Sequence, residues 1–254
     1  MSDEITRLFP VPEASGQQPL TDTDLLALYA PADRSVSHLR ANFVSSVDGS
    51  ATASGLTAAL GGPADKRVFD LLRQAADVIV VAAGTIRSEG YGAMRLSDTA
   101  ESWRVENGLA PQPAFAIVTG SLALDPTSDV FTKAPVRPLV LTSSSAPEDR
   151  RSALSAVADI VDCGDETVEA TALVSALHGR GLLQVHCEGG PSLLGTLIAA
   201  DVLDTLCLTV SPALEGGHGP RITRVAEPID LQAMTLDLVL VSGSMLLTSY
   251  TRSR

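Results

Sequence analysis

The spacing of hydrophobic residues changes twice between residues 42 and 95. A short apolar run ends at Asp48-Gly49, apolar residues then recur at helical spacing from Val68 to Ala75, and a continuous β-branched run covers Val78 to Val81. This order predicts a strand, a loop, a helix and a second strand that returns to the same sheet by a right-handed crossover. A continuous apolar strand also predicts a sheet that helices cover on both faces.

The same alternation continues to the C-terminus and predicts a single α/β domain over residues 38–254, preceded by a proline-containing lead-in segment over residues 1–37. Residues 96–113 are polar and predict a helix or an excursion. The other predicted elements are helices at 23–29, 148–158, 168–177 and after Pro191, strands at 114–119, 139–142, 160–163, 183–187 and 203–210, and a final antiparallel hairpin formed by 236–241 and 245–250.

Two glycine-containing turns stand at the ends of predicted strands. Gly189-Gly190 leads directly into a helix that starts at Pro191, so free backbone N–H groups lie at the positive end of a helix dipole, where a pyrophosphate fits. Gly84-Thr85 repeats the arrangement after another strand. Two such turns favour a dinucleotide, and a tight turn without a ligand is the open alternative. The sequence contains no G-x-G-x-x-G motif, which argues against an ordinary Rossmann domain.

Composition narrows the classes of partner. The chain has 254 residues and a formal net charge of -12, which argues against binding to a nucleic-acid backbone. Three scattered cysteines predict neither a disulfide framework nor a metal site. No apolar run is long enough to cross a bilayer, so the sequence predicts a soluble, cytoplasmic protein that does not bind membranes.

The ordered combination of short motifs resembles a known family. The chain resembles the reductase domain of the bacterial riboflavin-biosynthesis deaminase-reductases, and above all the single-domain pyrimidine reductases of that family. The motifs that carry the resemblance are, in order, SVDG, GPADKRVFDLLR, a strand ending in GT, EGG before a helix, and LDTLCLTVSP before a glycine-rich loop. The resemblance runs from about residue 38 to the C-terminus. It implies a dihydrofolate-reductase-like α/β fold, with a mixed, mainly parallel sheet flanked by helices and a C-terminal antiparallel hairpin. It also implies NADPH as the cofactor and a homodimer. The zinc signature of the deaminase half is absent from the sequence.

The resemblance also implies a cofactor site on the two glycine turns and at the ends of the two middle strands. Arg87 is a further candidate for binding the 2′-phosphate of the cofactor, on the ground of its charge alone. The alternative is that Arg87 is a solvated surface arginine with no role in binding. The implied cofactor-binding residues are Gly84, Thr85, Arg87, Thr119, Thr142, Glu188, Gly189, Gly190, Pro191 and Ser192.

Five residues are implied to bind the substrate: Asn42, Asp48, Asp65, Arg95 and Glu188. Asp48 and Asp65 are the catalytic candidates, and Arg95 is the candidate for a substrate phosphate. Asp65 follows a proline at the start of a helix, as does the acid that binds the pterin in dihydrofolate reductases; its alternative is a first-turn acid stabilised by the helix dipole. The alternative for Asp48 is simple turn chemistry.

The function implied is an NADPH-dependent reductase of a ribosylaminopyrimidine phosphate of the 5-amino-6-(5-phosphoribosylamino)uracil type, with hydride transfer to the ribose C1′. Asp65 keeps open a dihydrofolate-reductase-like reduction of a dihydropterin. A non-catalytic NADPH-binding protein is the third hypothesis. A requirement for a phosphate on the substrate would separate the first two, because a pterin has none for Arg95 to bind.

Overall fold

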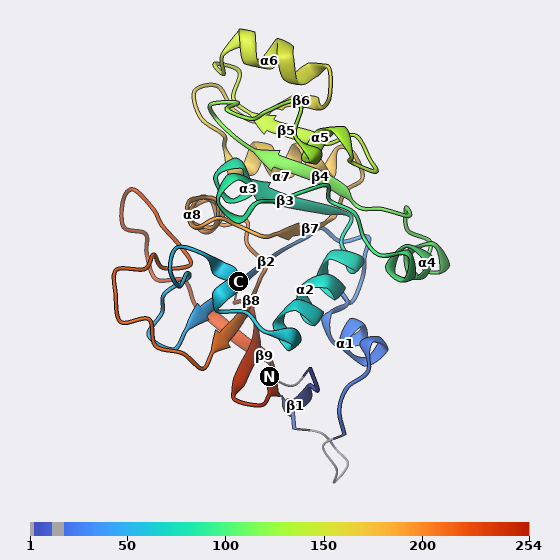
Figure 1. Ribbon diagram of the computed structural model, residues 1–254, viewed down its shortest axis with the longest axis vertical. Coiled ribbons are helices and arrows are strands. Elements are labelled where there is room, and N and C mark those ends of the chain that lie inside the picture. The colour runs from blue at the N-terminus through green and yellow to red at the C-terminus, as the bar shows by residue number, and fades with distance from the viewer. Residues whose placement is uncertain (1–2, 12–17, 254) are drawn as a thin grey trace.

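The computed structural model describes residues 3–11 and 18–253, and residues 1–2 and 12–17 of the predicted lead-in segment lie outside this range. In the described part of the chain, ten strands form one sheet in the order β1-β9-β10-β8-β2-β7-β3-β4-β5-β6 (Figure 1). The strands are β1 (Thr6–Phe9), β2 (His38–Ser46), β3 (Val78–Ala82), β4 (Ala114–Val118), β5 (Leu139–Thr142), β6 (Asp159–Asp162), β7 (Gln184–Cys187), β8 (Thr205–Ser211), β9 (Met234–Ser242) and β10 (Met245–Arg252).

Helices connect most of these strands. They are α1 (Asp22–Tyr29), the 3-10 turn η1 (Thr57–Ala59), α2 (Pro63–Ala75), α3 (Ala83–Glu89), α4 (Asp98–Glu106), α5 (Asp129–Thr132), α6 (Glu148–Ser155), α7 (Ala170–His178) and α8 (Pro191–Ala199). The predicted elements are present, with shifts of a few residues at their ends. Three features differ from the prediction: the edge strand β1, the short helix α5, and helix α3, which begins directly at the end of β3, so that Gly84 and Thr85 lie in its first turn.

The sheet is mixed and mainly parallel, as predicted. Strands β8, β2, β7, β3, β4, β5 and β6 run parallel to one another. Strands β9 and β10 form the predicted antiparallel hairpin, and β10 also pairs antiparallel with β8. The carboxyl ends of β2, β7 and β3 therefore meet at one edge of the sheet, where ligands bind in open α/β sheets.

Helices cover both faces of the parallel part. Val78 and Val80 of β3 pack into a cluster with α7 and α8, whereas Ile79 and Val81 pack into a second cluster with α3, α5 and α6. All four side chains are nearly inaccessible to solvent, which confirms the two-sided burial predicted from the continuous apolar run. Helices α1 and α2 cover β8, β9 and β10 with a third cluster.

The N-terminal segment takes part in the same sheet. Strand β1 pairs antiparallel with β9 at the edge, and α1 packs on α2 with Leu25 and Tyr29 buried. The Thr21 hydroxyl caps α1 by accepting from the N–H of Asp24. Strand β1 has only four residues and lies next to a proline, so its local pattern is too weak to predict a strand. Its pairing partner, β9, lies more than 200 residues away in the sequence.

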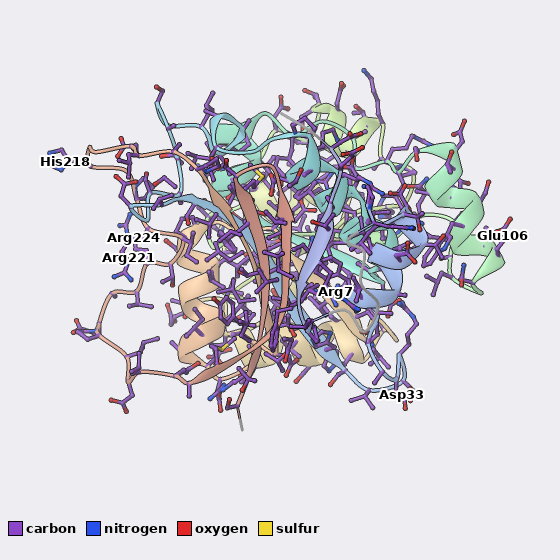
Figure 2. The ribbon with its side chains drawn as sticks, turned by 90° about the horizontal axis from the view of Figure 1, so that it is seen from below. Arg7, Asp33, Glu106, His218, Arg221 and Arg224 are labelled. Carbon is purple, nitrogen blue, oxygen red and sulfur yellow. The ribbon has the colours of Figure 1, made fainter. Side chains whose placement is uncertain are left out.

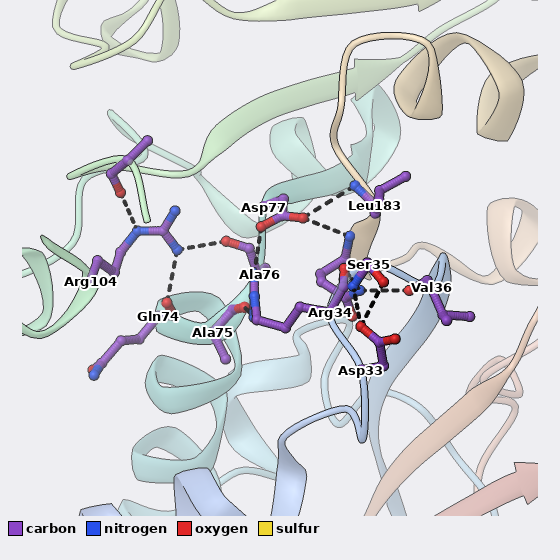
Figure 3. A network of polar contacts seen from close by, with 12 residues as sticks. Asp33, Arg34, Ser35, Val36, Gln74, Ala75, Ala76, Asp77, Arg104 and Leu183 are labelled. Atoms are coloured by element: carbon purple, nitrogen blue, oxygen red, sulfur yellow. Dashed lines mark hydrogen bonds and ion pairs between the residues drawn. The ribbon is translucent and has the colours of Figure 1, made fainter. Parts of the chain in front are cut away.

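Arg104 of α4 gives the polar stretch 96–113 a structural role. Its side chain is 1% exposed, and its guanidinium donates to the carbonyl oxygens of Gln74, Ala76 and Ala110 at 2.6–2.8 Å (Figure 3). Two of these oxygens belong to the end of α2 and the link to β3, so Arg104 satisfies backbone groups that the helix terminus leaves without partners. Burial lowers the pKa of Arg104 to about 10, so it stays charged at neutral pH.

Replacing Arg104 by alanine is expected to lower the free energy of unfolding by about 3 kcal/mol or more, because three carbonyl oxygens lose their donor and two of them are buried. Urea unfolding followed by circular dichroism measures the change. Arg104→Lys keeps the charge but cannot reach all three oxygens with one ammonium group, so it should recover only part of the loss. A loss below about 1 kcal/mol in the alanine variant would mean that water replaces the guanidinium.

Candidate active site

A cleft of ≈ 460 Å³ opens at the carboxyl edge of the sheet, between β2, α2 and the start of α3. It is the place where the topology predicts a ligand. Six of the predicted site residues line it: Asn42, Asp65, Thr85, Glu188, Gly190 and Pro191.

The two glycine turns predicted to hold a dinucleotide lie side by side. The N–H of Ala82, just before α3, donates to the carbonyl oxygen of Gly189 at 2.7 Å. Gly189 has a φ of +95°, and a Cβ on it would lie 2.9 Å from the Phe43 ring. A Cβ on Gly190 would lie 2.7 Å from the Thr85 hydroxyl. Position 189 therefore requires glycine, whereas a side chain at position 190 would displace the Thr85 hydroxyl, which faces bare backbone at the start of α8.

Asp65 lies in the first turn of α2 and faces the cleft. Burial raises the pKa of its carboxyl, and a hydrogen bond from the side chain of Thr209 on β8 offsets part of this rise. A Cβ on Gly61 would lie 2.8 Å from Asp65 Oδ2, so glycine there leaves room for the carboxylate. A first-turn acid that only served the helix dipole would gain nothing from this partial burial.

Glu188 lies at the base of the cleft, and its side chain is 1% exposed. Its two oxygens accept from Arg73 Nε and Nη2 at 2.5 and 2.6 Å, and Oε2 also accepts from the Tyr91 hydroxyl at 2.9 Å. Burial opposes the charge of Arg73, but the hydrogen bonds and charge of Glu188 outweigh it and raise the pKa of Arg73. Buried His186 places Nε2 3.7 Å from Glu188 Oε1, and burial lowers the pKa of His186 so that the ring is neutral.

Arg73 is the main site residue that the sequence reasoning missed. Its guanidinium carbon lies 4.1 Å from the centroid of the Phe69 ring, and Phe69 lines the cleft. Asp65, Phe69 and Arg73 are spaced by four residues and so form one stripe along α2. That spacing is a signal that could have been found. Arg73 does not line the cleft itself. The unpredicted residues that line it and carry polar side chains are Thr52, Thr57, Lys66, Ser88, Glu89 and Tyr91.

Other predicted residues do not line the cleft. Arg87 donates to the carbonyl oxygen of Ala123, and Arg95 is exposed. Thr119 accepts from the N–H of Leu122, and the buried Thr142 hydroxyl has no hydrogen-bond partner among the described residues. Gly84, Gly189 and Ser192 flank residues that line the cleft but do not line it themselves.

Asp48 is likewise outside the cleft and joins two loops. Its carboxylate accepts from the Ser46 hydroxyl and from the N–H groups of Glu215 and Gly216, the latter two at 3.1 and 2.8 Å. These hydrogen bonds, led by that of Ser46, lower the pKa of Asp48 to about 2. The contact with Ser46 is local turn chemistry, whereas the hydrogen bonds from Glu215 and Gly216 join this turn to a distant loop.

Asp48→Asn is expected to destabilise the protein at neutral pH, because an amide cannot accept the same hydrogen bonds. A carboxyl with a lowered folded-state pKa contributes stability above its unfolded pKa of 3.8, and this contribution is lost as the pH falls toward about 2. The difference in Tm between the variant and the wild type should thus narrow from pH 5 to pH 3. Faster amide hydrogen exchange at Glu215 and Gly216 in the variant would locate the effect in the loop, and unchanged exchange there would contradict it.

The described residues contain no group of three or more His, Cys, Asp or Glu side chains placed to hold a metal ion. Within residues 3–11 and 18–253, no helix has the length and apolar character needed to span a membrane.

Comparison with known proteins places the chain in a family. The family model described as "RibD C-terminal domain" matches residues 37–245. The 2,5-diamino-6-ribosylamino-4(3H)-pyrimidinone 5′-phosphate reductase of Archaeoglobus fulgidus is 29% identical over 154 residues, covering 61% of this chain and 70% of that protein. The protein of the same name from Methanothermobacter thermautotrophicus is 28% identical over 216 residues, covering 83% and 95%.

A solved structure agrees with the sequence comparisons. A pyrimidine reductase-like protein from Corynebacterium diphtheriae superposes with a TM-score of 0.84 at 26% identity, covering 92% of this chain and 100% of that chain. The expected dihydrofolate-reductase-like fold and family resemblance are thus confirmed. Because the family model spans most of the chain and the curated relatives are named reductases, this chain is an oxidoreductase of the RibD C-terminal domain family.

Proposed function

We propose that this chain is an NADPH-dependent reductase of a 2-aminopyrimidinone that carries a ribosylamino phosphate, the class of substrate in the names of its archaeal relatives. The observation that carries the proposal is Asp65, a partly buried carboxyl in the cleft. A carboxylate accepts two parallel N–H bonds, and the 2-amino group and N3–H of such a pyrimidinone present two adjacent donors.

This geometry refines the expected substrate. In a uracil, N3–H lies between two carbonyl oxygens, so a carboxylate would gain one hydrogen bond and face an oxygen of like partial charge. Asp65 therefore favours the diaminopyrimidinone over the uracil form. Asn42, in the middle of β2, lines the cleft. Glu188 follows β7 directly and is paired with Arg73 of α2. These residues would border the rest of the substrate.

The residues at the glycine turns fit a dinucleotide cofactor. The bare backbone at Gly190, the Thr85 hydroxyl and the free N–H groups at the start of α8 form a cradle that a Cβ at position 190 would fill. NADPH would supply a hydride to the ribose C1′ of the opened, imine-like substrate, giving a ribitylamino product. The protein's own part is to orient the pyrimidine through Asp65 and to exclude water.

Reduction of a dihydropterin is the second candidate, because a pterin presents the same amino and N–H donors to Asp65. NADPH oxidation by the purified protein should be measured with the ribosylaminopyrimidine phosphate, its uracil counterpart and dihydrofolate in parallel. Faster turnover of the diaminopyrimidinone supports the proposal. Turnover of dihydrofolate alone would replace it with the second candidate, and NADPH binding without turnover of any substrate would support the non-catalytic hypothesis.

We also propose a homodimer, as the resemblance implies. Leu206, Leu208 and Val210 of β8 stay partly exposed on one face, next to Tyr250 and the exposed Leu246 of β10, and such an apolar face suits a second copy. Light scattering after size-exclusion chromatography, with Leu208→Asp as the disrupting variant, tests this point.

A further inference from the structure

The loop between β8 and β9 borders the cleft through what we call the rim segment, residues 218–224. Its backbone is attached at two points. The N–H of Ala51 donates to the carbonyl oxygen of Pro220 at 2.7 Å, and the N–H of Arg224 donates to that of Pro191 at 2.9 Å. Ala51, Pro191 and Pro220 all line the cleft. Residues 221–223 therefore span the rim between the loop after β2 and the first residue of α8.

Glycines let the rim segment sit tightly on its neighbours. A Cβ on Gly219 would lie 1.8 Å from the Ser50 hydroxyl oxygen, and a Cβ on Gly195 of α8 would lie 2.2 Å from the carbonyl oxygen of Arg224. Any side chain at these positions would push the segment away. The backbone that carries Arg221 and Arg224 is thus held in place at both ends, which lowers the entropy cost of binding a ligand there.

The rim segment carries positive charge that nothing in the described structure neutralises. Arg221, Arg224 and His218 are exposed and project outward from the same loop (Figure 2). Within the described residues, the guanidinium groups of Arg221 and Arg224 form no hydrogen bond or ion pair. The nearby Glu215 carboxylate instead accepts from the N–H groups of Gly217 and Gly219. Two such arginines at the mouth of a cleft stand out in a chain with a net charge of -12.

We propose that Arg221 and Arg224 form a phosphate-binding site at the rim of the cleft. A guanidinium binds phosphate oxygens through two parallel N–H bonds, and the start of α8, next to Arg224, adds further N–H donors. Arg221 and Arg224, like Arg87 and Arg95, do not line the cleft themselves, but Arg221 follows Pro220 and the N–H of Arg224 binds Pro191, and both prolines line it. The phosphate comes from the substrate or from the dinucleotide. The inference rests on the proposed function only for the identity of these ligands.

Equilibrium binding to the Arg221→Ala/Arg224→Ala double variant tests the site without turnover. Titrations use NADPH, the ribosylaminopyrimidine phosphate and its unphosphorylated riboside. At least one phosphorylated ligand should bind about 10- to 100-fold more weakly to the variant, and the difference should shrink at high salt, whereas the riboside should bind unchanged. The control is Arg7→Ala/Arg180→Ala, which removes two charges from outside the rim segment and should leave all affinities unchanged.

The pattern of losses identifies the source of the phosphate. Weaker binding of the pyrimidine phosphate alone assigns the site to the substrate, and weaker binding of NADPH alone assigns it to the cofactor. Inorganic phosphate should raise the Tm of the wild type but not that of the double variant. This measurement does not depend on the proposed reaction. Affinities and phosphate shifts that match the wild type in every arm, or equal losses in the control, would overturn the proposal.

Discussion

Replacing Asp65 by asparagine is expected to lower kcat/KM about 100-fold while raising the Tm of the ligand-free protein at neutral pH. The loss of activity follows from the cleft geometry, because an amide can accept only one of the two N–H bonds that a carboxylate accepts from an aminopyrimidine edge. The gain in stability follows from burial, which raises the pKa of the Asp65 carboxyl and so disfavours its charged form in the folded state.

The sign of the pH dependence makes this prediction specific. An acid with a raised folded-state pKa contributes no destabilisation below its unfolded pKa of 3.8, and the folded state loses stability as the pH rises through the raised value. The Tm difference between Asp65→Asn and the wild type should therefore vanish below about pH 4 and grow toward neutral pH. Thermal unfolding over this range, with steady-state kinetics at neutral pH, measures both effects.

Asp98→Asn is the matched control. Asp98 also lies in the first turn of a helix, α4, but it is exposed and outside the cleft. Removing its charge should slightly lower the Tm through the helix dipole and leave kcat/KM unchanged. If Asp65→Asn behaved in the same way, the helix-dipole alternative for Asp65 would be correct and the proposed role in substrate binding would be wrong.

The parts of the fold that could be predicted have strong local signals. The β-branched run from Val78 to Val81 and the Gly189-Gly190-Pro191 turn each specify their backbone within a few residues. The order of strands and helices followed from such segments, and so did the adjacency of the two glycine turns, since parallel strands end at the same edge. The position of Asp65 could be predicted for the same reason, because its place after Pro63 fixes it in the first turn of the helix.

The contacts that could not be predicted join distant segments. Glu188 was expected to face the substrate, but its partner Arg73 lies 115 positions earlier in the chain, and no local pattern joins them. Asp48 was expected in the cleft, but its carboxylate binds backbone N–H groups more than 160 residues away. The hydrogen-bond partners of arginine are the hardest to predict from sequence, because its long side chain has five donors that can reach several distant segments. Arg104, for example, donates to three carbonyl oxygens.

The Arg73–Glu188 pair is expected to show strong coupling in a double-mutant cycle. Arg73→Met should lower the free energy of unfolding by about 3–5 kcal/mol at neutral pH, because it leaves the Glu188 carboxylate, 1% exposed, without its countercharge. Adding Glu188→Gln to that variant should restore much of the loss, since an uncharged amide can still accept from the Tyr91 hydroxyl. Urea unfolding of the wild type, both single variants and the double variant gives the coupling energy.

The double variant also separates charge from packing. A buried carboxylate without its countercharge destabilises the fold, whereas a buried amide carries no charge, so Arg73→Met/Glu188→Gln should be more stable than Arg73→Met alone. A double variant that is no more stable than Arg73→Met would attribute the loss to the contact of Arg73 with the Phe69 ring instead of the ion pair. In that case Glu188 would be free to act on the substrate, as the sequence predicts.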